Sequence, residues 1–276
     1  MKKKPEFLNL EEIHSALLGI LVEFDRVCRE NNLHYSLAFG TLIGAIRHKG
    51  FIPWDDDVDV VMPRPDYEKL YELVNSGKIK FSEHFLLSED RGKKAFYPFY
   101  KLMDDRYLIK SWSHLEVPYL YIDIFPIDGA PTGEKALEKL YKRRLHYSGV
   151  CALARWAVPE NKWGALLRAV LFPFYLGCTI YGKARASRKA NYYALQNDFE
   201  TCEYASTFNF GTKKWTLKRE QFLDLIEVPF EDRHFYAIAD YDEWLRLIYG
   251  DYMQPPKEGK RISHSLRVRR REEGLK

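Results

Sequence analysis

The sequence contains few cysteines, and they are widely separated: Cys28, Cys151, Cys178 and Cys202. No C-x-x-C pair is present, which argues against a zinc knuckle and a disulfide scaffold and fits a reducing compartment. A signal peptide is not predicted either, because the basic start MKKKPEF meets Glu11 and Glu12 before any apolar run. We therefore expect a cytoplasmic protein.

A long apolar run is missing as well. The most apolar stretch, residues 165–181 (ALLRAVLFPFYLGCTIY), has only 17 residues and contains Arg168 and Pro173, so it is marginal for spanning a bilayer. It lies in a region that is poor in acids, since residues 142–189 contain ten Lys or Arg but a single acid, Glu160. The basic residues are Lys142, Arg143, Arg144, Arg155, Lys162, Arg168, Lys183, Arg185, Arg188 and Lys189.

Two interpretations of this basic region stay open. Basic flanks accompanied by Trp and Tyr are typical of a helix that lies in the interface of an anionic membrane. The same apolar residues would also suit a buried pair of core helices. Nucleic-acid binding uses basic and aromatic residues too, but no recognition motif is present, so no nucleic-acid partner is expected.

The chain does contain enough apolar material for a substantial core, with 276 residues of which 46% are hydrophobic. Apolar residues spaced by three and four predict a helix over residues 10–29, and Asn9 with Glu12 suits its N-terminal cap. Further elements are expected as follows: a helix over 66–74 after Pro65, strands over 97–103 and 119–125, a charged helix over 134–147, a strand-and-turn segment over 211–230, and a helix over 241–249 begun by Asp240. This mixture predicts an α+β fold.

Residues 34–67, HYSLAFGTLIGAIRHKGFIPWDDDVDVVMPRPDY, carry the densest chemistry of the chain. A short apolar strand over residues 35–39 is broken by Gly40 and Thr41, and Thr41 is predicted to cap a helix over residues 42–47. The exposed N–H groups at the start of such a helix suit an anion. The helix ends in a basic group formed by Arg47, His48 and Lys49.

An acidic run follows Trp54 and consists of Asp55, Asp56, Asp57 and Asp59. On a strand, Asp57 and Asp59 point to one face while the valines between and after them point to the other. Crowded carboxylates repel one another, and hard oxygen ligands side by side can bind Mg²⁺ that also carries substrate phosphates. Acid runs are often solvated turns, but the Gly-Thr turn and the basic group beside this one favour a metal site.

The stretch FGTLIGAIRHKGFIPWDDDVDVVMPRPDYEKL closely resembles the signature of the LicD family, phosphocholine transferases that decorate bacterial surface glycans, and the same core occurs in fukutin-related proteins. The resemblance continues in KLMDD (101–105), YIDIFPIDG (121–129) and YGDYMQPP (249–256), and is weak over residues 135–215. It implies a nucleotidyltransferase-like fold, a mixed β-sheet flanked by helices. In that fold a Gly-Thr turn, a D-x-D pair and a later Asp build a metal–nucleotide site.

The resemblance assigns roles to particular residues of this chain. Asp57, Asp59 and Asp123 are the implied metal ligands and catalytic residues, for Mg²⁺ or alternatively Mn²⁺. Asp123 lies in an apolar strand, where an Asp is costly to bury unless it is paired or metal-bound. A general-base role for Asp123 or Asp56, and a plain position on a half-exposed strand, remain alternatives.

The remaining candidate residues bind substrate. Gly40, Thr41, Arg47, Lys49 and Lys101 are expected to contact phosphate, although Lys101 could also be an ordinary surface lysine on a strand. Trp54 or a Tyr could cage a quaternary ammonium group through cation–π contact. His264, in a basic tail over residues 257–271, is given a weak role near the substrate by the resemblance.

Three segments are expected: a nucleotidyltransferase-like catalytic core (1–134), a helical basic insertion that faces the acceptor or a membrane (135–215), and a C-terminal segment that returns to the core (216–276). The predicted activity is Mg²⁺-dependent transfer of a phospho-alcohol, foremost phosphocholine from CDP-choline, onto a hydroxyl of a cell-surface glycan or a teichoic acid precursor, with release of CMP. A lipid-linked glycan is among the expected acceptors, and it would place a cytoplasmic enzyme peripherally at the inner face of the membrane.

Other functions remain open at this point. The same metal chemistry would serve a nucleotidyltransferase that makes a CDP-alcohol from CTP and releases pyrophosphate. A D-x-D glycosyltransferase is a less favoured choice, since no sugar-nucleotide domain pattern is evident. A non-catalytic scaffold at a membrane surface, with a structural ion in the acidic cluster, would neither bind a cytidine nucleotide with Mg²⁺ nor consume one.

Overall fold

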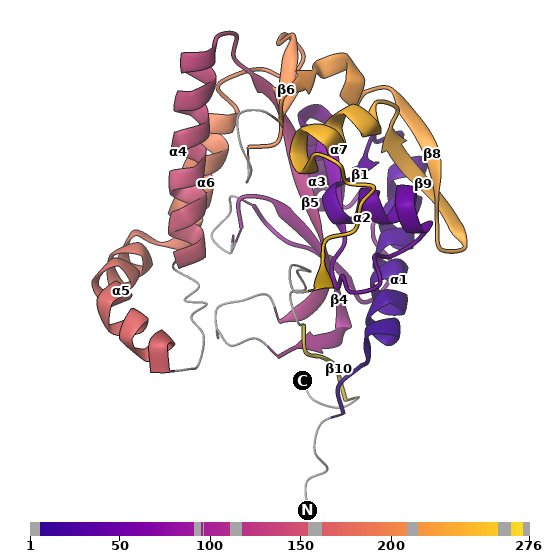
Figure 1. Ribbon diagram of the computed structural model, residues 1–276, viewed down its shortest axis with the longest axis horizontal. Helices are drawn as coiled ribbons and strands as arrows, with labels where there is room; N and C mark the ends of the chain where they lie inside the picture. Colours follow the sequence, from indigo (N-terminus) through magenta and orange to yellow (C-terminus); the bar gives the residue numbers. More distant parts are fainter. Residues whose placement is uncertain are drawn as a thin grey trace, which may run out of the picture.

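The computed structural model of the chain describes residues 6–90, 95, 97–110, 118–153, 162–208, 215–258 and 266–272. Strand β5 (Tyr119–Ala130) runs through the middle of a mixed sheet of order β1-β2-β5-β4-β10 (Figure 1). The neighbouring strands are β1 (Ser36–Leu37), β2 (Asp59–Pro63), β4 (Tyr100–Ile109) and β10 (Val268–Arg270). Strand β2 pairs with β5 in parallel, and the other pairs in this order are antiparallel.

Shorter strands extend the sheet at its edges. Strand β3 (Phe85–Leu87) pairs with β4, and β6 (Tyr204–Ser206) pairs with the far end of β5 and with β7 (Leu217–Lys218). Strands β8 (Leu225–Phe230) and β9 (Arg233–Ile238) form a separate hairpin after the 3₁₀ turn Arg219–Phe222. Strand β6 therefore returns to the core sheet from within the range 135–215.

Helix α1 (Leu10–Glu30) confirms the predicted first helix and its cap. The amide of Glu12 donates to Asn9 Oδ1 and the amide of Asn9 donates to Glu12 Oε2, both at 2.9 Å, which satisfies two N–H groups that the helix cannot pair. Residues spaced by three and four, such as Ile13, Leu17 and Ile20, are buried on the face that contacts β4 and β5. The apolar spacing of the sequence therefore defines both the helix and its buried face.

Helices α3 (Arg64–Asn75) and α7 (Tyr241–Tyr249) also form where they were predicted. The short helix after β1 differs from its prediction. It begins at Phe39 and runs as α2 (Phe39–Ile43) into the π-helix Gly44–His48. The backbone of Phe39 is left-handed (φ 48°), and its ring packs at 5.4 Å from Trp244, which holds this strained start in place.

Thr41 consequently lies inside the helix, so its prediction as the cap was wrong. Its hydroxyl, in a side chain only 5% exposed, accepts a hydrogen bond at 2.9 Å from the amide of Asp59. Thr41 thus fixes the first residue of β2 against the helix that precedes the acidic run.

The basic region folds into α4 (Glu134–Leu153), α5 (Lys162–Tyr181) and α6 (Lys183–Ala194). Helices α4 and α6 lie side by side, and α5 lies at the outer edge of the molecule beyond them (Figure 1). Helix α6 docks on the core because Ser187 Oγ donates to the carbonyl groups of Asp90 and Tyr97.

For residues 170–181 of the apolar stretch the structure does not support a buried position, because none of these side chains is buried. Arg144 on α4, by contrast, is fully buried near Asp128, so it is not part of a basic surface. Among the helices that the structure describes, none is long and apolar enough to cross a membrane.

Candidate active site

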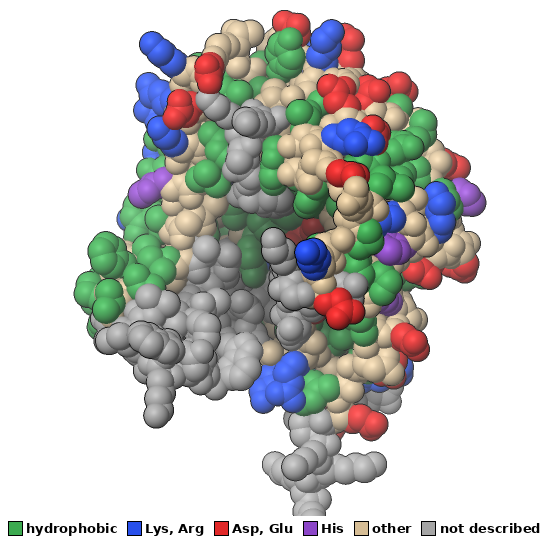
Figure 2. All heavy atoms as spheres, in the orientation of Figure 1, with side chains coloured by type: hydrophobic (Ala, Val, Ile, Leu, Met, Phe, Trp, Pro, Cys, Tyr) green, Lys and Arg blue, Asp and Glu red, His purple; other side chains and the backbone are tan. Residues whose placement is uncertain are grey.

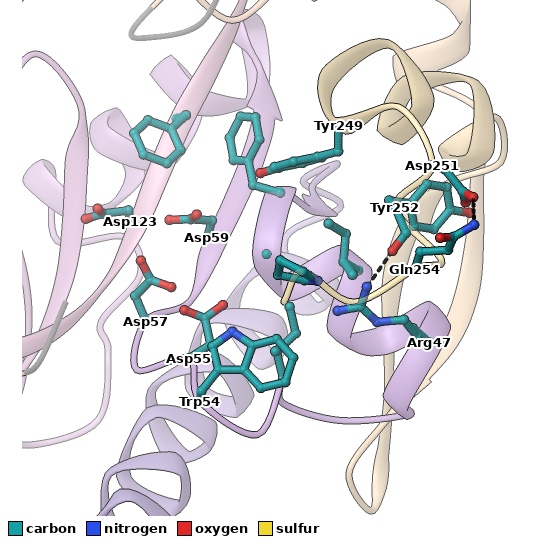
Figure 3. Close-up of a pocket in the computed structure, with 16 residues that line it drawn as sticks. Arg47, Trp54, Asp55, Asp57, Asp59, Asp123, Tyr249, Asp251, Tyr252 and Gln254 are labelled. Atoms are coloured by element: carbon teal, nitrogen blue, oxygen red, sulfur yellow. Dashed lines mark hydrogen bonds between the residues drawn. The ribbon is translucent and has the colours of Figure 1, made fainter. Parts of the chain in front are cut away.

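Three adjacent strands place charged residues in one row. In the register of the sheet, Asp59 on β2 is opposite Asp123 on β5, and Asp123 is opposite Lys101 on β4. Residues that are directly opposite point to the same face, so the three side chains lie next to one another. Asp57 precedes β2 and lies near the same end of the row (Figure 3).

These acids line one end of a cavity of about 590 Å³. Figure 2 shows this face of the molecule hollowed in its middle, with acidic side chains in the hollow. Four carboxylates, those of Asp55, Asp57, Asp59 and Asp123, form the acidic end, and aromatic rings form much of the remaining wall (Figure 3). The other lining residues are Phe39, Gly40, Ile43, Arg47, Ile52, Trp54, Phe125, Tyr249, Asp251, Tyr252, Gln254 and Pro256.

The acidic end has the electrostatics of a cation site. Burial raises the pKa of the Asp59 carboxyl well above its usual range, and the charges of Asp57, Asp123 and Asp55 raise it further, with Lys101 acting in the opposite direction. Within the described residues, no three His, Cys, Asp or Glu side chains are already arranged as a metal-binding group. The carboxylates nevertheless share one space, and their mutual repulsion together with their hard oxygen donors fits Mg²⁺.

Lys101 forms an ion pair with Asp123. Its side chain is 1% exposed, and its ammonium group pairs with Asp123 Oδ1 inside a cage of aromatic rings. The Nζ atom lies 3.4 Å from the ring centroid of Tyr121 and 4.2 Å from that of Tyr97. The structure thus places this amine against a carboxylate of the site and not among the lining residues of the cavity, where a phosphate contact would require it. Lys101 is a positioning residue for Asp123.

Arg47 supplies a positive charge on the wall opposite the acids (Figure 3). Its Nη1 donates to the carbonyl oxygen of Tyr252 at 2.5 Å and its Nε donates to His48 at 2.9 Å. Partial burial lowers the pKa of the guanidinium, which still stays charged near neutral pH. In the described part of the chain no carboxylate forms an ion pair with Arg47, so its charge is available to an anionic ligand.

Other predicted site residues lie elsewhere. Lys49 is exposed, is absent from the cavity wall, and donates from Nζ to the carbonyl of Ile46 at 3.1 Å. Asp56 is 2% exposed and accepts a hydrogen bond at 2.7 Å from the amide of Leu266, so it tethers the chain before β10 and does not face the cavity as a base would. His264 lies outside the described residues. Trp54 lines the cavity, and its contact with a quaternary ammonium group stays a prediction.

Tyr249 was not singled out from the sequence, and Asp55 was named only as a member of the acidic run, yet both line the cavity. The hydroxyl of Tyr249, at the end of α7, points toward the acids (Figure 3). Burial raises its pKa, and the charges of Asp59, Asp55 and Asp57 raise it further, so it stays protonated and can donate a hydrogen bond. The only sequence signal for Tyr249 was its place in YGDYMQPP, whose side-chain roles periodicity does not reveal.

The position of Asp55 depends on two neighbours. The His14 ring stacks on Phe51 at 4.1 Å, and its Nε2 lies 2.7 Å from the carbonyl oxygen of Asp55. Gly40 lies so close that a Cβ there would be 2.7 Å from Asp55 Oδ2. The glycine of the predicted turn is therefore required for the approach of this carboxylate, not for a left-handed backbone.

We expect Gly40→Ala to reduce activity about tenfold or more, because the added methyl displaces the Asp55 carboxylate while the rest of the fold remains. Gly19→Ala is the matched control: Gly19 lies on the exposed side of α1 with nothing within 4 Å of a new Cβ. That change should leave activity unaltered and stabilise the helix by about 1 kcal/mol. Steady-state rates and denaturant unfolding of both variants test this, and equal rates would contradict it.

A mixed α+β fold with an acidic cavity of this kind defines an enzyme candidate, and comparison with known proteins identifies its family. Residues 32–147 match the family model described as LicD/FKTN/FKRP, nucleotidyltransferase domain. The chain is 32% identical over 271 residues to the lipopolysaccharide cholinephosphotransferase LicD of Haemophilus influenzae, covering 93% of this chain and 96% of that protein. The chain therefore belongs to the LicD family, and it is a transferase.

Shorter similarities extend to two proteins without an assigned activity. The uncharacterized protein RP689 of Rickettsia prowazekii is 34% identical over 59 residues, which are 21% of this chain and 22% of that protein. The uncharacterized protein RT0683 of Rickettsia typhi is 37% identical over 81 residues, which are 28% of this chain and 26% of that protein. These matches are too short to bear on the activity.

Proposed function

We propose that this chain transfers phosphocholine from CDP-choline to a hydroxyl group of a lipopolysaccharide glycan, with Mg²⁺ as cofactor and CMP as the released product. The observation that carries the proposal is the cavity itself, in which four carboxylates face one end and Arg47 stands on the opposite wall. The Haemophilus relative is a lipopolysaccharide cholinephosphotransferase whose similarity spans nearly the whole chain, and this supports the choline and lipopolysaccharide parts. A teichoic acid precursor is the alternative acceptor that the sequence resemblance suggested.

The residues that would hold the metal are Asp57, Asp59 and Asp123. When bound, Mg²⁺ or Mn²⁺ would neutralise the negative charge that develops on the diphosphate as the phosphorus–oxygen bond breaks. The pairing of Lys101 with Asp123 Oδ1 fixes the direction of this carboxylate. We propose that this grouping of three carboxylates on a mixed sheet is the metal site of a nucleotidyltransferase-like fold.

The chain's own residues orient the reactants. The acceptor oxygen bonds to the phosphorus of the phosphocholine group, the bond from that phosphorus to the CMP oxygen breaks, and the hydroxyl proton passes to a carboxylate of the cavity. Arg47 binds the anionic phosphates from the opposite wall. The Trp54 ring offers a face on which the trimethylammonium group can be held by cation–π contact.

The alternative within the same chemistry joins phosphocholine to CTP, forming CDP-choline and pyrophosphate. Its support is the matching family model, which describes a nucleotidyltransferase domain. The two reactions differ in the product that leaves, so product identity separates them. A scaffold without catalysis would release neither product.

The test incubates the purified chain with CDP-choline, MgCl₂ and lipopolysaccharide from cells grown without choline, and follows CMP, pyrophosphate and choline incorporation together. We expect CMP and incorporated choline in equal amounts, and no CMP after EDTA treatment. Pyrophosphate from CTP and phosphocholine would favour the nucleotidyltransferase. Absence of nucleotide turnover with every acceptor and donor would contradict both enzymatic proposals.

A lipid-anchored acceptor also implies where in the cell the enzyme acts. An enzyme that acts on a glycan still attached to lipid meets its substrate at the membrane surface, so we propose a peripheral position at the inner face of the membrane.

A further inference from the structure

Helix α5 is apolar around much of its circumference, yet it is exposed. Val170, Phe172, Phe174 and Ile180 have 61%, 54%, 65% and 75% of their surface open to solvent. In Figure 2 these apolar side chains gather at the left edge of the molecule, over the position of α5 in Figure 1. A helix that is apolar all round is normally covered by other apolar material, so something outside the described chain should cover α5.

The C-terminal end of α5 nevertheless packs against α4 and α6. The Tyr181 ring at its C-terminal end stacks on Tyr147 of α4, with centroids 6.3 Å apart, and the guanidinium of Arg185 lies 5.4 Å from the Tyr181 ring. The sulfur of Cys151 donates to the carbonyl of Lys183, where the chain passes from α5 into α6. These contacts join the C-terminal end of α5 to α4 and α6, while the apolar side chains before it stay exposed.

Positive charge accompanies this apolar surface. Residues 162–194, which form α5 and α6, contain six Lys or Arg and no Asp or Glu. Arg185, Arg188 and Lys189 are exposed, and in the described residues none of them forms an ion pair with a carboxylate. A binding partner should therefore offer an apolar layer to α5 and an anionic layer to the basic side chains of α6. An anionic lipid membrane has both layers.

A second copy of this chain fits the surface less well. In a twofold dimer each α5 patch would meet an equivalent region of its partner, so the basic side chains of both copies would face one another. Like charges in contact oppose association, whereas anionic lipid headgroups attract the same side chains.

We infer that α5 is a membrane-binding helix that lies in the headgroup region of an anionic bilayer, with its apolar side chains inserted and the basic residues of α6 on the lipid phosphates. Membrane binding through α5 requires neither the metal nor the donor. Its failure would therefore leave the proposed transfer reaction untouched.

The experiment measures sedimentation of the full-length chain with phosphatidylcholine vesicles and with mixed phosphatidylcholine–phosphatidylglycerol vesicles. Val170→Ser, Phe172→Ser and Phe174→Ser are combined in one variant. A control variant combines Leu86→Ser, Leu223→Ser and Ile226→Ser, at exposed apolar positions outside α5. We expect the α5 variant to lose binding to mixed vesicles roughly tenfold or more, while the control binds like the wild type.

A second variant tests the charge. Arg185→Gln with Arg188→Gln should weaken binding to mixed vesicles about tenfold or more and should change binding to phosphatidylcholine vesicles little. Circular dichroism and thermal unfolding establish that each variant is folded, which we expect because all the changed side chains are exposed. A Trp at position 174 (Phe174→Trp) should be quenched by brominated lipid chains, and a Trp at position 223 (Leu223→Trp) should not.

Two results would overturn the inference. One is equal binding of mixed vesicles by the wild type and the α5 variant, including no binding by either. The other is a wild-type dimer that the α5 variant converts to a monomer while neither form sediments with vesicles, which would assign α5 to a second copy of the chain.

Discussion

Replacing Asp59 with asparagine is expected to lower the rate of CMP release by about a thousandfold or more while the protein stays folded. Asparagine keeps the shape of the side chain but removes the charge that a cation would need. Because Asp57, Asp123 and Asp55 already oppose ionisation of Asp59, the metal-free fold should be as stable as wild type or more stable. Asp57→Asn should behave in the same way.

Rates with CDP-choline and unfolding by denaturant in EDTA measure the two halves of this prediction. Asp251→Asn is the matched control, because Asp251 lines the same cavity but accepts a hydrogen bond from Gln254 at 2.7 Å, away from the acidic end. It should keep most of the activity. Retention of more than about a tenth of the wild-type rate by Asp59→Asn would contradict the assignment of the acidic pair.

The sequence predicted well those elements whose signals are local. The apolar spacing and the Asn9–Glu12 pair of α1, and the apolar run of β5, are each contained in one stretch of chain, and both elements form where they were predicted. The start of α2 was misplaced because Phe39 adopts a left-handed backbone that a bulky residue rarely takes. That conformation depends on Phe125 and Trp244, which are remote in sequence.

In the site, too, features with local signals were predicted and features that depend on contacts between distant segments were missed. Alternation along one strand indicated that Asp57 and Asp59 share a face, but the partnership of Asp123 with Lys101 required the register between β4 and β5. Likewise, a lysine in a strand gives no sign that the rings of Tyr97 and Tyr121 will lie against its amine. Tyr249 reaches the acids only because α7 packs beside α2, a contact between segments some 200 residues apart.

Asp123→Asn is the second large expected effect, and the structure sharpens the choice between its roles. A carboxylate paired with an ammonium group is a weak base, so the contact with Lys101 favours the metal-ligand role. We therefore expect the variant to bind Mg²⁺ and CDP-choline together more weakly, and excess Mg²⁺ to restore part of the rate. If Asp123 were the base, binding would stay near wild type, the transfer step would slow by about two to four orders of magnitude, and added metal would not help.

The same substitution leaves Lys101 buried without its carboxylate, so loss of stability must be separated from loss of chemistry. We expect Asp123→Asn to lower the free energy of unfolding by roughly 1–3 kcal/mol, less than for a fully buried pair because Asp123 is 19% exposed. Adding Lys101→Met should recover most of this stability, since methionine suits the cage of Tyr97 and Tyr121, but it should not recover the rate. If the double variant regained both, the effect of Asp123 on turnover would come from folding. If Asp123→Asn left both binding and turnover unchanged, Asp123 would be neither a metal ligand nor a base, but only a residue of the core strand.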